Sequence, residues 1–209
     1  FSRFTHQGQI CMSANRVPVH QDVFKDFTER YVEKVKTLKV GDPRAEDTIM
    51  GPLITAKQAE NLNAAVDKAV ADGATPIVRG KVDGGLFEPV VLLDVDPDME
   101  VAQRELFGPV VSLIPFRDDD EAVEMANNTQ LGLSGAVHTS DLDRGVALAR
   151  RVQTGMIHVN DCTIHDEPNV AFGGEKQSGL GRLNGAWSLD AFTTLQWVSV
   201  NHGRRQFPY

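Results

Sequence analysis

Long apolar segments and cysteines are both scarce in this sequence. No apolar run approaches the roughly 20 residues that a bilayer-spanning helix needs, and no secretion signal is recognisable at the start of the chain. The two cysteines, Cys11 and Cys162, lie far apart in the sequence. Because so low a count is typical of proteins in a reducing compartment, we expect a cytoplasmic protein without a disulfide.

Positive charge is also in short supply. The chain has 21 Lys and Arg against 29 Asp and Glu, which gives a formal net charge of −8 at pH 7. A nucleic acid or an anionic membrane surface attracts basic proteins, so neither is an expected partner. With 209 residues, of which 41% are hydrophobic, the chain can form one large domain with a substantial core.

Hydrophobic periodicity predicts alternating strands and helices. From residue 109 to 160 strand, helix, strand, helix and strand follow one another, which is typical of an α/β fold. We therefore expect an open, mostly parallel twisted sheet with helices on both faces. Pro18 favours an edge position or a strand start for the segment 16–20. The expected strands are 16–20, 75–80, an apolar run over 84–95, 109–116, 133–139, 155–160 and 193–200, and the expected helices are 22–38, 55–72, 118–128, 140–152 and 185–192.

Two of the expected strands, 155–160 and 193–200, suggest a ligand-binding position and an interface. Ligands of such sheets bind at the carboxyl ends of strands, so Asn160 and the loop after it are candidates by position. The strand over 193–200 has no obvious partner within the sequence. An unpaired edge strand can pair with another chain, which predicts an interface there.

Several other sequence patterns are weak evidence for a nucleotide-binding or metal-binding site when taken alone. The glycine-rich stretch AFGGEKQSGLGR (171–182) lacks the Gly-Lys-Ser/Thr of a phosphate loop, and Asn184 stands where a dinucleotide motif has its third glycine. Its glycines instead suggest close passage of the backbone. Cys162 and His165 are too few ligands for a structural zinc site, so no metal is expected. The acidic run 118–121 is interpreted as a solvated helix start.

Cys11 and Glu105 each allow more than one interpretation. Cys11 lies among amide and glycine residues rather than apolar ones, and it could be a packing residue, a metal ligand, half of a disulfide or a nucleophile. Glu105 precedes a Gly-Pro turn at the start of a strand, where it could be a surface charge or could bind hydroxyl groups at a cleft. The residues alone leave both questions open.

Four segments together carry a more specific signal. GQICMSANR (8–16), ELFGPV (105–110), GMIHVN (155–160) and AFGGEKQSGLGR, in this order and spacing, resemble the aldehyde dehydrogenase superfamily from Phe1 to about Val200. The resemblance implies that Cys11 attacks an aldehyde, and that the thiohemiacetal becomes a thioester as hydride passes to NAD or NADP. It also implies that Glu105 binds the ribose hydroxyls of the cofactor and that Phe107 packs near its nicotinamide.

The resemblance implies a substrate pocket as well. The loop from Asn160 to Phe172 holds acidic residues and no lysine or arginine, so a substrate with an anionic tail finds no partner there. The sequence HDEPNVAFGG (165–174) is similar to the corresponding segment of benzaldehyde-, vanillin- and salicylaldehyde-type members of the family. We therefore expect a neutral aromatic or bulky aldehyde, with succinic or another semialdehyde as the alternative. The expected pocket residues are Thr5, Ile10, Met12, Asn160, Cys162, His165 and Phe172.

The domain organisation follows from the same resemblance. Residues 1–192 correspond to most of the catalytic domain, and residues 193–209 to an oligomerisation strand and tail that would form a homodimer or homotetramer. The family's nucleotide-binding domain, oxyanion-hole asparagine and general-base glutamate precede the cysteine and are not among these residues. We therefore expect the chain alone to be inactive. The competing hypotheses are a cofactor-independent cysteine acyl-transferase or hydrolase domain, and a non-catalytic assembly module.

Overall fold

A four-stranded sheet forms the centre of the protein. The computed structural model describes all 209 residues, and its main sheet has the order β1-β6-β5-β2. Strands β1 (Arg16–His20), β6 (Val110–Phe116) and β5 (Val90–Leu93) are parallel, and β2 (Thr75–Arg79) is an antiparallel edge strand. The open, mostly parallel sheet is confirmed. Pro18 lies in the other edge strand, where a missing N–H is tolerated.

The alternation of side chains along β5 and β6 puts one helix on each face of this sheet. Val90 and Leu92 face a core cluster shared with α2 (Ala56–Ala71). Val91, between them, faces the cluster that includes Val35 of α1 (Gln21–Val35). Because successive strand residues point to opposite faces, the all-apolar run VVLL is buried on both sides. Helices on both faces are thereby confirmed.

The helix starts follow their capping residues. Thr55 accepts a hydrogen bond from the Gln58 N–H through its hydroxyl at 3.1 Å, as expected for the start of α2. Helix α1 ends at Val35, three residues before the predicted end at Leu38. The N–H groups of Thr37 and Leu38 instead bond to carbonyls three residues back, which tightens the chain out of the α-helical form.

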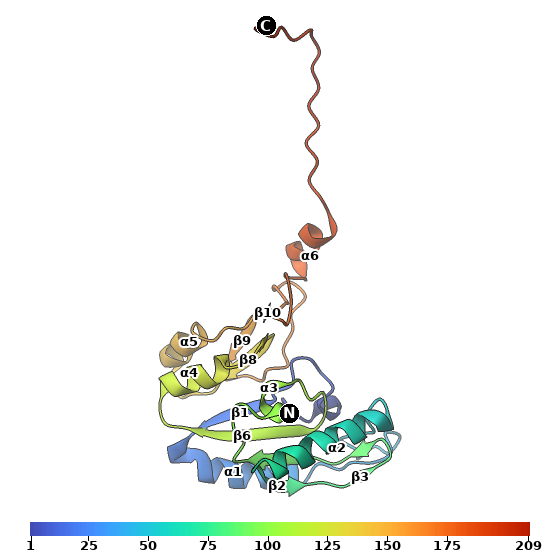
Figure 1. The fold of residues 1–209 in the computed structure, drawn as a ribbon, viewed down its shortest axis with the longest axis vertical. Coiled ribbons are helices and arrows are strands. Elements are labelled where there is room, and N and C mark those ends of the chain that lie inside the picture. Colours follow the sequence, from blue (N-terminus) through green and yellow to red (C-terminus); the bar gives the residue numbers. More distant parts are fainter.

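A smaller lobe is built on a second pair of parallel strands, β8 (Ser134–Val137) and β9 (Met156–Val159). Helices α4 (Asp119–Asn127) and α5 (Leu142–Ala149) belong to this lobe, which lies over the main sheet (Figure 1). These strands do not join the main sheet, so the expectation of a single continuous sheet is wrong in this respect. The predicted helix 140–152 is shorter than expected at both ends. The Asp141 carboxylate caps its start by accepting from the Arg144 N–H at 3.0 Å, and the N–H groups of Arg151 and Val152 bond to carbonyls three residues back, outside the α-helical pattern.

Short elements connect the longer ones. The predicted apolar run 84–95 divides into β4 (Leu86–Phe87) and β5 around Pro89, which has no N–H to continue a ladder. The helix predicted at 185–192 is confirmed. The short elements are the 3₁₀ turn η1 (Thr5–Gly8), β3 (Val82–Asp83), β4 (Leu86–Phe87), α3 (Glu100–Gln103), β7 (Leu131–Gly132), β10 (Glu175–Lys176) and α6 (Gly185–Phe192).

The segment after α6 leaves the body of the protein as an extended chain (Figure 1). Leu195, Trp197 and Val198 within it are exposed. The strand predicted over 193–200 is not formed in the single chain, because no other strand lies beside it to complete the hydrogen bonds. Its pairing with a second copy stays a prediction. No helix in the structure has the length and apolar character needed to cross a bilayer.

Candidate functional site

Cys11 is exposed in a turn between η1 and β1. The turn is closed by the Ser13 N–H, which donates to the Ile10 carbonyl at 2.9 Å, and is fixed at its start by a bond from the Gln9 N–H to the His6 carbonyl. The Cys11 N–H donates to no group of the chain. The thiol and a backbone donor are therefore both available to a ligand at one position. Thr5, Ile10 and Met12 are half-buried nearby in the sequence.

The Cys11 loop is in direct contact with the loop that carries Glu105. Gly8 has a φ of +71°, and a Cβ placed on it would lie only 2.4 Å from the Gly108 carbonyl oxygen. The buried Arg3 guanidinium holds the two loops together by donating to the carbonyls of Ala14 and Gly108. Burial lowers the pKa of Arg3 to about 10. Sequence reasoning missed Arg3, because an isolated arginine carries no motif.

Glu105 and Phe107 are both exposed on this second loop. Phe107 has a φ of 49°, a conformation that costs an aromatic residue free energy and that recurs at active sites and ligand-binding loops. The Gln58 side-chain amide donates to the carbonyls of Leu106 and Phe107 at 3.1 and 3.3 Å, and Leu106 is buried. The loop is thus anchored by its backbone while Glu105 and Phe107 stay free.

The loop after β9 forms a separate cluster. Asn160, directly at the carboxyl end of β9, has a φ of 60° and accepts from the Thr139 N–H at 2.8 Å. The Cys162 thiol donates to the Ile164 carbonyl at 3.1 Å. Strand-end placement of Asn160 is therefore as predicted, and Cys162 is half-buried within its own loop.

His165 is held by two carboxylates in this loop. Its Nδ1 lies 3.0 Å from Asp161 and its Nε2 lies 3.4 Å from Glu167, and these hydrogen bonds raise its pKa above the usual 6.5. The bonds therefore favour the folded loop below pH 6.5, and that contribution is lost as the pH rises through the higher folded-state pKa. The ring stacks on His158 at 5.2 Å, and burial, followed by the charge of His165, lowers the His158 pKa.

Phe172 is half-buried and pairs with Leu183 through two backbone hydrogen bonds, of 3.1 and 2.7 Å. The glycine-rich stretch that follows passes very close to other backbone. A Cβ placed on Gly155 would lie 1.8 Å from the Gly173 carbonyl oxygen. Close backbone passage, the role predicted for these glycines, is confirmed.

The expected site residues therefore fall into two groups. Cys11 and its neighbours are joined to the Glu105 loop by the contact of Gly8 with Gly108. Asn160, Cys162, His165 and Phe172 belong to the smaller lobe, and no hydrogen bond joins them directly to the Cys11 loop. A substrate pocket that includes both groups stays a prediction. No three His, Cys, Asp or Glu side chains are arranged to hold a metal ion.

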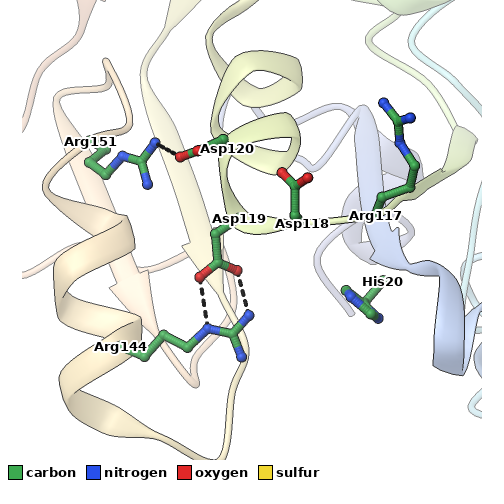
Figure 2. Close-up of a pocket in the computed structure, with 7 residues that line it drawn as sticks. All are labelled: His20, Arg117, Asp118, Asp119, Asp120, Arg144 and Arg151. Carbon is green, nitrogen blue, oxygen red and sulfur yellow. Dashed lines mark hydrogen bonds and ion pairs between the residues drawn. The ribbon is translucent and has the colours of Figure 1, made fainter.

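A cavity of about 510 Å³ lies elsewhere, between α4, α5 and the end of β1, and has no hydrophobic lining residue (Figure 2). Asp119 receives two hydrogen bonds from Arg144 of α5, and Asp120 pairs with Arg151. The predicted helix start at residues 118–121 is confirmed, with Asp118 and Asp120 exposed, although Asp119 and Asp120 also pair with arginines distant in sequence. Asp118 caps α4 by accepting from the Glu121 N–H at 3.0 Å.

Comparison with known proteins identifies the family. Residues 1–198 match the description "Aldehyde dehydrogenase family". The chain belongs to the aldehyde dehydrogenase family. It is 63% identical to benzaldehyde dehydrogenase YfmT of Bacillus subtilis, over 100% of the chain and 43% of that protein. It is 47% identical to a vanillin dehydrogenase of Corynebacterium glutamicum, over 94% of the chain and 41% of that protein.

A solved aldehyde dehydrogenase structure has the same fold. The salicylaldehyde dehydrogenase of Pseudomonas putida G7, complexed with salicylaldehyde, matches with a TM-score of 0.94 and 33% identity. The match covers 100% of this chain and 43% of that one. The chain thus spans about two fifths of the length of these aldehyde dehydrogenases, and the resemblance inferred from its four motifs is confirmed.

The family implies a nicotinamide dinucleotide, and the exposed residues fit one end of it. A carboxylate such as Glu105 can accept hydrogen bonds from ribose hydroxyls, and the exposed Phe107 ring offers a face to the nicotinamide. The glycine-rich stretch does not supply a matching site for the phosphates. Gly179 and Gly181 lie in irregular structure and do not lead directly into the first turn of α6, as a phosphate-binding helix would require.

Proposed function

We propose that this chain supplies the catalytic thiol of an NAD(P)-dependent aldehyde dehydrogenase that oxidises neutral aromatic or bulky aldehydes to carboxylic acids. The observation that carries the proposal is the contact between two loops. One presents the exposed Cys11, and the other presents the exposed Glu105 and Phe107, with Gly8 packed on Gly108 between them. A nucleophile and a cofactor-binding pair are thereby held at one place.

The chemistry assigned to the chain begins at Cys11. Its thiolate adds to the aldehyde carbon, and the unpaired Cys11 N–H donates to the oxygen that becomes negatively charged. A bound dinucleotide would supply the hydride acceptor, so that the thiohemiacetal on Cys11 would lose hydride and become a thioester. Water then adds to the thioester carbonyl, and the acid leaves as the Cys11 thiol is restored. Glu105 and Phe107 would hold the ribose and nicotinamide end of that dinucleotide.

The substrate class follows from the charge of the loop 160–172. Asp161, Asp166 and Glu167 are all exposed, and Asp161 and Glu167 are both within hydrogen-bonding distance of His165. A carboxylate on the substrate would meet like charge there, and the only basic side chain of the loop, His165, is already held by Asp161 and Glu167. Two relatives whose names state activity on benzaldehyde and vanillin support an aromatic substrate.

We expect the full-length protein to have a higher kcat/KM for benzaldehyde than for succinic semialdehyde, by about tenfold or more. One additional unpaired charge in the pocket is enough to produce this difference. Initial rates with both aldehydes at saturating cofactor measure it. A higher kcat/KM for the semialdehyde would overturn the proposed substrate class.

Glu105→Gln should lower kcat/KM for the cofactor and leave the reactivity of the Cys11 thiol unchanged. Loss of a charge-assisted hydrogen bond to the ribose costs about 1.5–3 kcal/mol, or roughly 10- to 150-fold in kcat/KM for the cofactor. Ester hydrolysis through Cys11 needs no dinucleotide and should persist. Steady-state kinetics of both reactions provide the test. Equal loss of both activities would contradict the role of Glu105, and would instead favour a cofactor-independent thiol domain.

The 209-residue chain by itself should neither bind the dinucleotide well nor oxidise aldehydes. Glu105 and Phe107 contact one end of the cofactor, and so few contacts do not offset the cost of ordering a large ligand, so the Kd should be about 1 mM or weaker. Calorimetry with NAD⁺ measures this directly. Micromolar binding would show that the chain contains a complete nucleotide site.

The proposal extends to assembly and location. Residues 193–200 expose apolar side chains without a partner strand, which suits pairing with a second copy in a homodimer or homotetramer. Cys11 and Cys162 are both free thiols, and a reducing cytoplasm would preserve the reactive state of Cys11.

A further inference from the structure

The carboxyl end of α4 has no basic residue of its own in its last turn. The final carbonyls of a helix lack partners within it and carry partial negative charge. We call the backbone carbonyls of residues 125–129 the α4 carbonyl cluster. Its partners come from other parts of the chain, and each of these parts is next to a segment of the proposed site.

Arg16 supplies the first partner. It lies five residues after Cys11, at the start of β1. Its guanidinium donates to the carbonyls of Met125 at 2.9 Å, Asn128 at 3.0 Å and Ala126 at 3.3 Å. The planar fork of an arginine makes such multiple contacts directional. The end of the Cys11 loop is therefore fixed against α4.

Lys176 supplies the second partner. It lies in β10, four residues after Phe172 at the end of the proposed substrate loop. Its Nζ donates to the Asn127 carbonyl at 2.8 Å and to the Thr129 carbonyl at 2.9 Å. The substrate loop is thereby anchored on the same cluster as the Cys11 loop.

Gln103 supplies a third, neutral partner. Gln103 lies two residues before Glu105 in the sequence. Its side-chain amide donates to the Asn128 carbonyl at 3.1 Å. Asn15, next to Arg16, donates to the carbonyls of Val101 and Arg104 at 3.0 and 3.2 Å. The Cys11 loop and the Glu105 loop thus meet at this end of α4 as well as at Gly8.

Neither cation is paired with a carboxylate. Arg16 and Lys176 are half-buried, and neither forms a salt bridge, unlike Arg144 and Arg151 at the other end of α4. Burial lowers the pKa of Arg16; burial and then the charge of Arg16 lower that of Lys176. Bringing two partly desolvated cations together is unfavourable. The negative partial charge of the carbonyls offsets this repulsion, and their contacts tie two separate loops to the same end of α4.

We propose that Arg16 and Lys176 are positioning residues, which set the Cys11 loop and the substrate loop against each other through the α4 carbonyl cluster. The inference deepens the proposed function and rests on it for its kinetic consequences. Arg16 fixes the position of the Cys11 thiol relative to the Glu105 loop. Lys176 fixes the position of the substrate loop relative to α4. The two residues should therefore affect different kinetic constants.

The test is a split of kcat against KM in the full-length protein. Arg16→Met should lower kcat by about tenfold or more with the KM for benzaldehyde within about threefold, because a small displacement of a reacting group costs that much. Lys176→Met should raise that KM by about tenfold or more with kcat within about threefold. Rates are normalised to the concentration of Cys11 that iodoacetamide labels. A merely structural role would instead lower the labelled fraction and leave both normalised constants unchanged.

Conservative variants and a matched control complete the test. Lys176→Arg should restore KM to within about threefold, whereas Lys176→Gln keeps a donor without the charge and should give an intermediate value. Arg16→Lys serves if Arg16→Met does not fold, and should lower kcat by a smaller factor. The control is Lys57→Met, which removes an exposed cation paired with Glu60 on α2 at 3.0 Å. Effects no larger than those of Lys57→Met would overturn the proposal.

A measurement without cofactor separates this inference from the proposed function. Lys176→Met should speed amide hydrogen exchange in residues 160–172, and Arg16→Met should speed it in residues 9–15, by about tenfold in each case. Unchanged exchange in both segments would overturn the positioning role. If the parent protein fails to oxidise any aldehyde while these changes occur, the proposed function fails and the connection through α4 stands.

Discussion

Cys11→Ser in the full-length protein is expected to reduce aldehyde oxidation by about 10⁴-fold or more. A serine hydroxyl is far less ionised than a thiol near neutral pH, and serine lacks a neighbouring base in this turn. The turn itself should persist, because its hydrogen bonds use the backbone of Ile10 and Ser13 rather than the thiol. The loss should therefore appear in kcat, while the affinity for the dinucleotide stays within about threefold. Stopped-flow measurement of NADH formation and calorimetry with NAD⁺ test the two parts.

The second cysteine provides the comparison. Cys162 donates to the Ile164 carbonyl within its own loop, so Cys162→Ser should keep kcat within about tenfold, although KM can change if the side chain lines the pocket. Iodoacetamide should inactivate this variant and the parent protein alike. Inactivation only when Cys162 is present, or a Cys11→Ser variant that retains substantial activity, would refute the assignment of the nucleophile.

Gly8→Ala is expected to separate the two loops of the proposed site. The left-handed φ of +71° disfavours alanine, and the added methyl would lie 2.4 Å from the Gly108 carbonyl oxygen, which belongs to the backbone and cannot rotate away. Strain and overlap together should cost about 2–5 kcal/mol of unfolding free energy. A displacement of about 1 Å between Cys11 and the Glu105 loop should also lower kcat by about 100-fold.

Gly84→Ala is the matched control for this substitution. Gly84 also has a positive φ, of +56°, but a Cβ placed on it meets nothing within 4 Å. It should therefore show only the backbone cost, about 1–2 kcal/mol, and leave kcat unchanged within about twofold. Urea unfolding and initial rates on both variants separate strain from contact. Equal effects at the two glycines would show that the contact of Gly8 with Gly108 does not position the site.

Most elements of the fold were predictable because their signals are local. The buried strand β6, the cap of α2 at Thr55 and helix α6 all follow from residues within or next to the element. The errors occurred where a distant partner decides the outcome. Strands β8 and β9 pair with each other rather than with the main sheet, and residues 193–200 have no partner in the single chain. Side-chain alternation predicts a strand but does not identify its neighbour.

The same division holds for charged residues. Asp118 was predicted as part of a helix start, since a cap needs only the N–H groups of its own first turn. Asp119 pairs with Arg144, 25 positions away, and no spacing rule connects them. Arg3 was missed for the same reason, because its partners Ala14 and Gly108 belong to different loops.

The sequence by itself determined the family, because four motifs in a fixed order carry chemistry that few other folds need. It also determined the candidates Cys11 and Glu105, whose residue types and local context are read directly. Only the tertiary structure decided that Gly8 packs on Gly108 and that Arg16 and Lys176 meet at one end of α4. Such contacts depend on how loops from distant segments are folded against each other, and the chemistry of each segment alone does not specify them.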